Sequence, residues 1–512
     1  MSAAGKSTFR SRKNYGNSLT ENRKSNLLPP EKRSRATPDQ HAISWVDAHQ
    51  EGPRWTWRQL ARYAAGAAWA LAAYGIGAQH RVAVIGGNTP EWIVLREAVR
   101  LRGATFIPIS PKITAEERDF LLRNSEAALA VGPPDMPAGE LAVEDWSAFY
   151  GREADEPPQL NDAPQPQQLL YTSGSGGVPK GVLRSRGSDL ARMQMSIQQY
   201  GLSADMRHLV AGPLYHSGPS IFYRMFLLLG APQQMLRRFD AKRVLELILS
   251  EQVDALFMVP TMWRMLLDAE GGHRRPWPLK RAWIAGSRTE PELRLELLDR
   301  LPEDALWEFY GATETGTIAV LPPEAQRSHM DTVGFPAPGV EIRIVDETGQ
   351  DVAPGATGRI YVKSPSLMTG YHRGPGTPAD LSEDRLEGGW VSVGDRGSFT
   401  ADGALKLIGR EKGMIISGGV NIYPEEVEQA IKKIDGVLEA VVFGIPDPIW
   451  GQRICAIVEP ASEATLTADD VRRALEGHLA HFKIPKQIRI APIPRTASEK
   501  VRRDAAQLAR LL

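Results

Sequence analysis

The sequence predicts an α/β protein with a large N-terminal domain of mixed and parallel sheets flanked by helices, a β-rich subdomain, and a small C-terminal α+β domain. Three observations support this fold class. Strands and helices alternate from residue 55 to residue 131, at the spacing of parallel sheets that carry helices on both faces. Residues 333–362 alternate with a period of two, and a further α/β pattern begins after residue 413. A chain of 512 residues is also long enough for two or more domains.

The N-terminal alternation sets the order of the first elements. Helices are expected over residues 55–74, 92–102 and from 115 onward, and strands over residues 81–85, 105–109 and 127–131. The Pro-rich residues 132–166 are typical of a linker. Farther along, apolar strands end in loops near Gly212, Val259 and Ala285. In open α/β sheets ligands bind where strands end, so these loops are candidate binding elements.

Composition excludes several classes of protein. Basic and acidic residues balance at 61 each, so no net field favours nucleic acid or an acidic partner. No run of about 20 apolar residues is present, which argues against a membrane span. The single cysteine, Cys455, lies in an expected strand, and one cysteine fits a reducing, cytoplasmic compartment. Residues 1–36 are basic and polar without an apolar core, so we expect a disordered tail there rather than a secretory signal.

A loop rich in glycine and hydroxyl groups lies between two expected strands and is the strongest motif in the chain. It consists of Thr172, Ser173, Gly174, Ser175, Gly176, Gly177 and, after a Val-Pro pair, Lys180. Glycines let successive backbone N–H groups converge on one anion, while the hydroxyls add donors and Lys180 adds positive charge. The spacing is not that of a Walker A loop, and the chain leaves the loop as a strand. We therefore expect a phosphate-binding loop of another kind.

A second motif brings an aromatic ring, a glycine, a hydroxyl and a carboxylate together at the end of an expected strand. In a nucleotide site Tyr310 can stack on a base, and Gly311 lets a ligand approach the backbone closely. Thr313 can donate to a phosphate, and Glu314 can hold Mg²⁺ through oxygen. Since these residues follow the phosphate loop in the chain, they favour a nucleotide site over an ordinary strand end.

Two further positions have the chemistry of a ribose site. The carboxylate of Asp395 can accept hydrogen bonds from both ribose hydroxyls, and Arg410 can reach the phosphate side of the sugar. Taken singly, each is more often structural. His216 lies in the loop after another strand. It can be interpreted equally well as a site residue or as a core histidine.

In their order along the chain, these motifs resemble those of the adenylate-forming superfamily, which includes acyl-CoA synthetases, peptide-synthetase adenylation domains and beetle luciferases. The resemblance runs from about Thr56 to Lys500 and includes the phosphate loop, the Tyr-Gly-x-Thr-Glu strand end, the Gly-Asp and Gly-Arg pairs and a Ser-Gly-Gly loop. It implies a reaction in two halves. A carboxylic acid attacks the α-phosphorus of ATP to give an acyl-adenylate and pyrophosphate, and a thiol then displaces AMP.

The resemblance also implies a role for each matching residue. ATP or AMP would contact Thr172, Ser173, Gly174, Ser175, Gly176, Gly177, Lys180, Gly286, Ser287, Tyr310, Gly311, Thr313, Asp395 and Arg410. The catalytic residues would be Lys500, His216, Thr313 and Glu314, with Glu314 as the Mg²⁺ ligand. Lys500 would bridge the acid and the α-phosphate, and His216 would lie between the adenylate and the acyl pocket.

The same resemblance divides the chain into two domains. Residues 37–411 would form the adenylate-forming domain and residues 412–512 a mobile C-terminal domain, with the hinge at Lys412. Rotation about this hinge would replace the face that carries Lys500 by the CoA channel, made of Ser417, Gly418 and Gly419.

Three residues depart from the family pattern. Gly176 replaces a hydroxyl residue, Arg186 replaces a histidine, and Glu499 replaces a glycine. These departures leave a non-catalytic nucleotide-binding homologue as an alternative.

The branch of the family that the chain most resembles is the acyl-CoA and aryl-CoA ligases, because the segment around Tyr215 and His216 lacks the aspartate of amino-acid-activating enzymes. The expected acyl pocket contains Tyr215, His216 and Phe222, with Tyr223 nearby. This apolar and aromatic set predicts an aromatic, medium-chain or polycyclic acid, with CoA as the acceptor. Open alternatives are a second carboxylate paired with Arg224, an acyl carrier protein as the thiol partner, and a homodimer.

Overall fold

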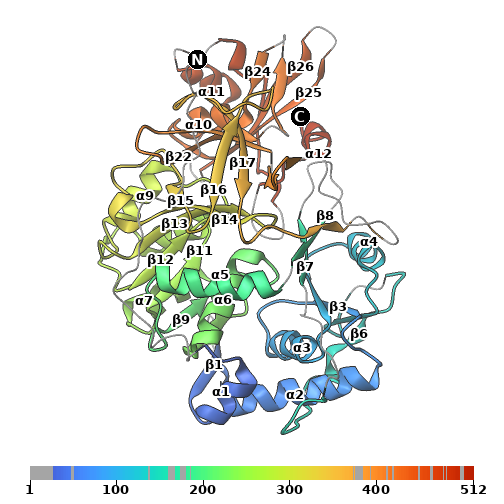
Figure 1. Ribbon diagram of the computed structural model, residues 1–512. Coiled ribbons are helices and arrows are strands. Elements are labelled where there is room, and N and C mark those ends of the chain that lie inside the picture. The colour runs from blue at the N-terminus through green and yellow to red at the C-terminus, as the bar shows by residue number, and fades with distance from the viewer. Residues whose placement is uncertain are drawn as a thin grey trace, which may run out of the picture.

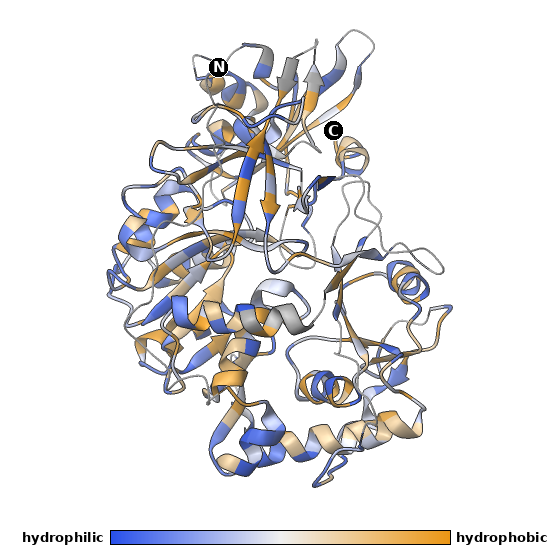
Figure 2. Ribbon diagram, viewed as in Figure 1, coloured by the Kyte–Doolittle hydropathy of each residue, from blue (hydrophilic) through white to orange (hydrophobic). Residues whose placement is uncertain are grey.

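The computed structural model folds into two large sheets, a β-subdomain and a C-terminal domain (Figure 1), which confirms the predicted fold class. It describes residues 27–47, 51–136, 139–159, 168–172, 180–184, 186–372, 374, 385–392, 394–410, 413–417, 420–447, 450–461, 465–476, 478–479, 481–495 and 501–512. Figure 2 shows that apolar residues follow the strands and the inward faces of the helices.

The first large sheet has seven strands in the order β18-β8-β7-β4-β3-β5-β6. Their bounds, in that order, are Gly370–His372, Lys180–Arg184, Gln168–Thr172, Thr105–Ile109, Arg81–Ile85, Leu129–Gly132 and Glu144–Asp145. The strands from β7 to β6 are parallel, whereas β8 and β18 run antiparallel to their neighbours. Helices α2 (Trp57–Ala73) and α3 (Pro90–Leu101) pack on one face and α4 (Ala115–Ser125) on the other.

The second large sheet has nine strands in the order β15-β14-β13-β12-β11-β9-β10-β1-β2. Their bounds are Phe335–Pro336, Gly316–Leu321, Leu306–Ala312, Arg281–Ile284, Ala255–Met258, His208–Val210, Gln233–Leu236, His41–Val46 and Glu51–Thr56. The strands from β13 to β1 are parallel. One face carries α7 (Ala241–Leu249), α8 (Pro260–Glu270) and α9 (Pro291–Leu298), and the other carries α5 (Arg186–Gln199) and α6 (Ser217–Leu229).

The β-subdomain is a six-stranded sheet that shares a core with α5 and α6. It contains β16 (Glu341–Val345), β17 (Gly358–Lys363), β19 (Arg385–Leu386), β20 (Trp390–Val391), β21 (Asp395–Phe399) and β22 (Leu405–Arg410). Because its apolar residues join those of the nine-stranded sheet, the subdomain is fixed against that sheet.

The C-terminal domain has cores of its own, on the two faces of a five-stranded sheet. The strands are β23 (Ile415–Ser417), β24 (Val420–Ile422), β25 (Val437–Asp447), β26 (Gly451–Pro460) and β27 (Gln487–Ile490). One core includes α10 (Pro424–Lys432) and α11 (Ala468–Leu475), and the other includes α12 (Ala505–Ala509). Cys455 is buried in the second core, as expected of a small apolar residue, and burial raises the pKa of its thiol.

Two expectations about the N-terminal half need correction. Pro30–Ala36, placed in the disordered tail, form helix α1, and Arg33 Nη2 donates to the carbonyl oxygens of Leu228 and Leu229 at 3.2 and 3.1 Å. Residues 132–166, interpreted as linker, contain β6 and a 3₁₀ turn at Trp146–Ala148, and Phe149 is fully buried against α2. In both segments a long-range contact outweighs a polar or Pro-rich composition.

The first long helix also starts later than expected. Trp55 belongs to β2, and α2 begins at Trp57 because Thr56 is its N-cap. The Thr56 hydroxyl accepts from the Gln59 backbone N–H at 3.3 Å, and the Gln59 side chain accepts from the Thr56 N–H at 2.9 Å. This capping box stops the helix at its N-terminus. Among all helices in the described ranges, none combines the length and apolarity needed to cross a membrane.

Candidate active site

The candidate site lies where strand ends of the two large sheets meet. β7 ends at Thr172, and β13 is followed by Thr313 and Glu314. The Thr172 hydroxyl donates to Glu314 Oε1 at 3.5 Å, and the Met368 backbone N–H donates to the Glu314 carbonyl oxygen at 2.7 Å. The structure therefore brings the two predicted nucleotide motifs together, although 142 residues separate them.

The expected phosphate end of this site is built from β7, β8 and β18. Lys180 starts β8 directly opposite Thr172 in the β7–β8 ladder. Lys180 Nζ lies 4.9 Å from the centre of the Tyr371 ring, and the Tyr371 hydroxyl donates to Glu314 Oε1 at 3.2 Å. Lys180 and Glu314 thus contact the same tyrosine, one at its ring and the other at its hydroxyl. The predicted loop residues Ser173, Gly174, Ser175, Gly176 and Gly177 lie outside the described residues.

The chemistry of the Glu314 surroundings fits Mg²⁺ bound together with a nucleotide. In the described part of the chain, no three acidic, His or Cys side chains gather as a metal-binding cluster. Mg²⁺ commonly uses one or two carboxylates and takes its other ligands from substrate phosphates and water. One carboxylate flanked by the hydroxyls of Thr172 and Tyr371 matches this kind of site.

The turn after β13 explains why glycine follows Tyr310. A Cβ on Gly311 would lie 2.1 Å from the Gly316 carbonyl oxygen, so any side chain would collide with β14. The β13–β14 ladder also shifts register between Tyr310 and Gly311. Beyond this bulge, the Thr313 hydroxyl lies 3.5 Å from the Ser217 hydroxyl, at the start of α6. The N-terminus of a helix favours anions, so Thr313 and α6 suit a phosphate or carboxylate group.

The expected ribose end contains Tyr310 and Asp395. The Tyr310 hydroxyl donates to Asp395 Oδ2, and Asp395 is 5% exposed at the start of β21. Asp395 pairs with Arg410 in the antiparallel β21–β22 ladder, so both predicted ribose residues occupy one end of this hairpin. Only the backbone of Arg410 is described.

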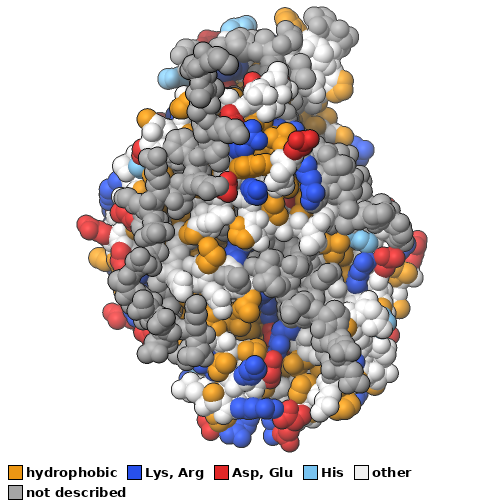
Figure 3. Space-filling view, in the orientation of Figure 1, with side chains coloured by type: hydrophobic (Ala, Val, Ile, Leu, Met, Phe, Trp, Pro, Cys, Tyr) orange, Lys and Arg blue, Asp and Glu red, His pale blue; other side chains and the backbone are white. Residues whose placement is uncertain are grey.

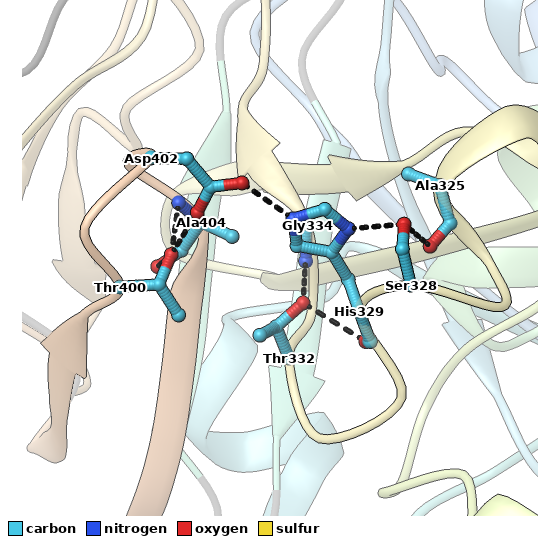
Figure 4. A network of polar contacts seen from close by, with 8 residues as sticks. All are labelled: Ala325, Ser328, His329, Thr332, Gly334, Thr400, Asp402 and Ala404. Atoms are coloured by element: carbon cyan, nitrogen blue, oxygen red, sulfur yellow. Dashed lines mark hydrogen bonds and ion pairs between the residues drawn. The ribbon is translucent and has the colours of Figure 1, made fainter.

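The opposite end of the β21–β22 hairpin is anchored to the loop after β14 (Figure 4). His329 Nε2 lies 2.7 Å from Asp402 Oδ2, and its Nδ1 lies 2.8 Å from the Ser328 hydroxyl. The Thr400 hydroxyl donates to Asp402 Oδ1 at 2.6 Å, and Lys406 Nζ forms an ion pair with Asp331 at 2.5 Å. These contacts fix the hairpin that carries Asp395.

Gly286 and Ser287, which are expected to contact ATP or AMP, follow the end of β12, next to β13 in the sheet. Gly286 has φ +101°, a conformation that glycine adopts without strain, and both Gly286 and Ser287 are exposed. Because Ile284 pairs with Glu308 in the ladder, these residues and Tyr310 emerge from neighbouring strand ends.

The expected acyl-pocket residues separate into two groups. Tyr215 and His216 lie at the start of α6 with ring centres 4.6 Å apart. Phe222 is 1% exposed within an aromatic cluster, with Phe257 and Trp283 at 5.1 and 4.5 Å between ring centres. The prediction that Tyr223 lies near the pocket is wrong. Tyr223 packs in a different core, where the Arg96 guanidinium lies 5.1 Å from the centre of its ring.

A buried histidine under α6 was not predicted. His208 stacks on Phe226 at 4.2 Å and hydrogen-bonds the Gln233 side chain at 2.9 Å. Burial lowers the pKa of His208 to about 4, so the imidazole is neutral near pH 7. It is a core residue beneath the candidate acyl side.

Several predicted residues are outside the part of the chain that the structure describes. They are Lys500, the hinge residue Lys412, and Gly418 and Gly419 of the CoA channel. Ser417 is described: it ends β23 and pairs with Val420 and Gly451.

Sequence analysis missed three residues that contact the site. Tyr371 contacts Glu314 and Lys180, Ser217 contacts Thr313, and the Asn88 side chain binds the loop before His216. The sequence around Tyr371 is typical of a strand, but nothing in it indicates that the tyrosine contacts Glu314. Asn88 follows two glycines at a strand end, which was a usable signal for a loop residue.

Comparison with known proteins adds independent information on this arrangement. A family model described as AMP-binding enzyme matches residues 30–372, and a model described as AMP-binding enzyme C-terminal domain matches residues 426–500.

Two curated relatives match nearly the whole chain. An indoleacetate–CoA ligase from Aromatoleum aromaticum is 34% identical over 474 residues, which are 88% of this chain and 92% of that protein. A feruloyl-CoA synthase from Amycolatopsis is 31% identical over 492 residues, which are 92% of this chain and 96% of that protein.

Among solved structures, o-succinylbenzoate CoA synthetase from Bacillus subtilis in complex with its acyl-adenylate intermediate is similar to this chain. The TM-score is 0.82 at 26% identity, over 94% of this chain and 98% of that one. The same enzyme with ATP and magnesium ion gives a TM-score of 0.81.

Proposed function

The chain belongs to the AMP-binding enzyme family, and from this membership we propose that it activates an aromatic carboxylic acid with ATP and transfers the acyl group to coenzyme A. It is an AMP-forming acid–thiol ligase that uses ATP, Mg²⁺ and CoA. The observation that carries the proposal is the meeting of Thr172, Glu314 and Tyr371 at the junction of the two large sheets.

The nucleotide would lie between the two ends of the site. Asp395 binds the ribose hydroxyls, since a buried carboxylate at this position can accept two hydrogen bonds. Thr172 and Lys180 would hold the β and γ phosphates, Thr313 would hold the α-phosphate, and Glu314 would hold Mg²⁺. The metal, when bound, offsets the negative charge of the phosphate oxygens.

The first half-reaction joins the acid to AMP. One oxygen of the acid's carboxylate attacks the α-phosphorus, and the bond from that phosphorus to the pyrophosphate oxygen breaks. Thr313 and the N-terminus of α6 donate to the oxygens on which charge develops, and Lys500 adds positive charge between the carboxylate and the α-phosphate. His216 lies at the N-cap of α6, next to the acid's entry to this centre.

The second half-reaction transfers the acyl group. The thiol of CoA loses its proton and attacks the acyl carbon, and the bond from that carbon to the AMP oxygen breaks. We propose that the domain boundary at residue 412 permits this exchange, with Lys412 as hinge and Ser417, Gly418 and Gly419 lining the thiol's path. On the face shown in Figure 3, Lys and Arg side chains lie among acidic and apolar side chains where the β-subdomain meets the C-terminal domain.

Two features favour an aromatic acid. The relatives described above are named for indoleacetate, ferulate and succinylbenzoate, all of which contain an aromatic ring. In this chain, Phe222, Phe257 and Phe309 form an aromatic cluster on the side of α6 that faces β11 and β13. Offset aromatic packing contributes beyond simple burial, so an aryl acid would gain from such a wall.

A panel of acids tests this proposal. Purified protein with ATP and Mg²⁺ is assayed for pyrophosphate release with arylacetates, hydroxycinnamates, medium-chain fatty acids and an aryl dicarboxylate, and CoA is then added. We expect an aryl monocarboxylate to give the highest kcat/KM, with AMP and thioester formed only when CoA is present.

Other outcomes of the panel would replace the proposal. A preference for the dicarboxylate would assign Arg224 to a second carboxylate. Pyrophosphate release without a CoA thioester would point to a carrier-protein thiol, and no release with any acid would favour a nucleotide-binding homologue without turnover.

A further inference from the structure

Asn88 lies at the junction of the two large sheets and is 2% exposed. It follows β3 of the seven-stranded sheet, but its side chain binds the nine-stranded sheet. Its Nδ2 donates to the carbonyl oxygens of Gly212 and Leu236, each at 3.0 Å, and its Oδ1 accepts from the Leu214 backbone N–H at 2.9 Å. Both amide donors are therefore used, and all three partners lie at the ends of β9 and β10.

The segment that Asn88 binds leads directly to His216. Gly212 and Leu214 flank Pro213, which has no N–H to donate. The Asn88 amide pairs with the carbonyl on one side of the proline and the N–H on the other, as a neighbouring strand would do. The turn continues with the His216 N–H donating to the Pro213 carbonyl oxygen at 3.1 Å.

The same segment packs tightly on the first turn of α6. A Cβ on Gly212 would lie 2.8 Å from Cγ of Pro219, so the loop and the helix are in close contact. The Ser220 N–H donates to the His216 carbonyl oxygen at 3.2 Å. A shift of the loop therefore shifts the N-terminus of α6, where Ser217 lies 3.5 Å from Thr313.

The backbone of Asn88 is also fixed by neighbouring residues. The indole Nε1 of Trp45, a residue 1% exposed in β1, donates to the Asn88 carbonyl oxygen at 2.8 Å. The next residue, Thr89, is the N-cap of α3 and accepts from the Trp92 N–H at 3.4 Å. With backbone and side chain both fixed, Asn88 can act as a rigid support.

We infer that Asn88 is a positioning residue for acid activation, which sets the place of His216 and of the α6 N-terminus relative to Thr313. This inference rests on the proposed function for the role of that loop. Asn88 does not contact the predicted nucleotide residues Thr172 or Asp395 in the bonds described above, so its removal acts on the acid side of the reaction. Misplacement of a reacting group by about 1 Å can cost ~10²-fold in rate.

The chain offers a matched control for a merely structural role. Gln326 is fully buried, and its Nε2 donates to the carbonyl oxygens of Leu321 and Leu306 at 2.9 and 3.4 Å. Like Asn88, it links two strands through a side-chain amide, but it lies outside the His216 loop. Asn88→Leu and Gln326→Leu each remove hydrogen bonds to buried backbone groups, so both lower thermal stability.

The experiment compares Asn88→Leu, Asn88→Ala and Gln326→Leu in the full-length protein. Backbone hydrogen exchange of the peptide spanning residues 211–217 measures the loop directly, and steady-state pyrophosphate release measures kcat and the KM values for ATP and for the best acid. In both Asn88 variants we expect exchange at Leu214 to accelerate about tenfold, kcat/KM for the acid to fall about 10- to 100-fold, and KM for ATP to stay within about twofold. Gln326→Leu should change none of these.

Two results would overturn the inference: unchanged exchange over residues 211–217 in folded Asn88 variants, or equal losses in the ATP and acid parameters. If wild-type protein shows no turnover with any acid, the proposed function fails, and the exchange measurement still decides whether Asn88 holds the loop.

Discussion

The two ends of the proposed nucleotide site, the ribose end and the phosphate end, are held in different ways. At the ribose end, Asp395 is buried and bound by Tyr310, and the hairpin that carries it is anchored at its far end by His329 and Lys406. At the phosphate end, the hydrogen bonds to Glu314 are long, at 3.5 and 3.2 Å, and Lys180 lies over the Tyr371 ring.

This difference indicates a division of labour. A preassembled ribose end would bind ATP with little rearrangement, because the Tyr310–Asp395 hydrogen bond and the anchored hairpin hold Asp395 in place beforehand. The Glu314 carboxylate, whose hydrogen bonds within the described residues are the long ones from Thr172 and Tyr371, could turn to a metal and strengthen its interactions in the transition state. We therefore expect changes at the ribose end to alter binding and changes at the phosphate end to alter rate.

The largest effect is expected from Lys500→Ala, which would remove the positive charge between the acid and the α-phosphate. Loss of one preorganised contact of this kind commonly costs ~10²–10³ in rate. Acid-dependent pyrophosphate release should fall by that factor. Thioester formation from chemically supplied acyl-adenylate should persist, because the rotated domain would carry Lys500 away from the site.

Lys412→Pro is the reciprocal variant for this experiment. Proline fixes φ at the proposed hinge, so it should spare adenylation and block thioester formation. If either folded variant, checked by circular dichroism, loses both half-reactions equally, the assignment of two conformations to this chain is wrong.

Glu314→Gln tests the phosphate end next. The substitution keeps the size of the side chain and its hydrogen bond from Thr172 but removes the charge that would hold Mg²⁺. We expect a loss of ~10²-fold in kcat for adenylation, the upper end of the range for an impaired metal site. Affinity for ATP in the absence of Mg²⁺, measured by titration calorimetry, should change little, and a large loss there would mean that Glu314 shapes the pocket instead.

At the ribose end, Asp395→Ala should weaken ATP binding. Removing one partner of a charged hydrogen bond costs about 1.5–3 kcal/mol, which corresponds to about 10- to 100-fold in Kd. The rate of adenylation at saturating ATP should be nearly normal. Unchanged ATP affinity would make Asp395 a structural residue that holds Tyr310.

The smallest effect is expected from Tyr371→Phe. This change removes the hydroxyl that donates to Glu314 but keeps the ring beneath Lys180. Loss of one hydrogen bond of about 0.5–1.5 kcal/mol should raise the Mg²⁺ concentration for half-maximal rate by about 2- to 10-fold. Tyr371→Leu, which also removes the ring, serves as the comparison. If it behaves like Tyr371→Phe, the Lys180 contact with the ring has no role in catalysis.

Local patterns in the sequence were sufficient for the main elements of the fold and for the two nucleotide motifs. The strand that ends at Tyr310 and the loop between Thr172 and Lys180 each combine an apolar run with residues whose chemistry is specific. The structure adds that Glu314 and Thr172 are in contact. This contact depends on how the two sheets pack, so the sequence of neither segment predicts it.

The residues that were missed have partners far away in the chain. Tyr371 lies 57 residues from Glu314, and Asn88 lies 126 residues from Leu214. Phe149 was assigned to a linker because the surrounding prolines dominated the composition, although its burial against α2 is complete. Sequence patterns describe single elements well, whereas contacts between elements require the fold.

The most direct test of the division of labour is to measure ATP dissociation and the single-turnover rate of adenylation side by side for Asp395→Ala and Glu314→Gln. We predict a crossover: Asp395→Ala raises the Kd for ATP about 10- to 100-fold with a near-normal rate at saturation, and Glu314→Gln keeps the Kd measured without Mg²⁺ but slows the chemical step by ~10²-fold. Losses of similar size in the same parameter for both variants would contradict it.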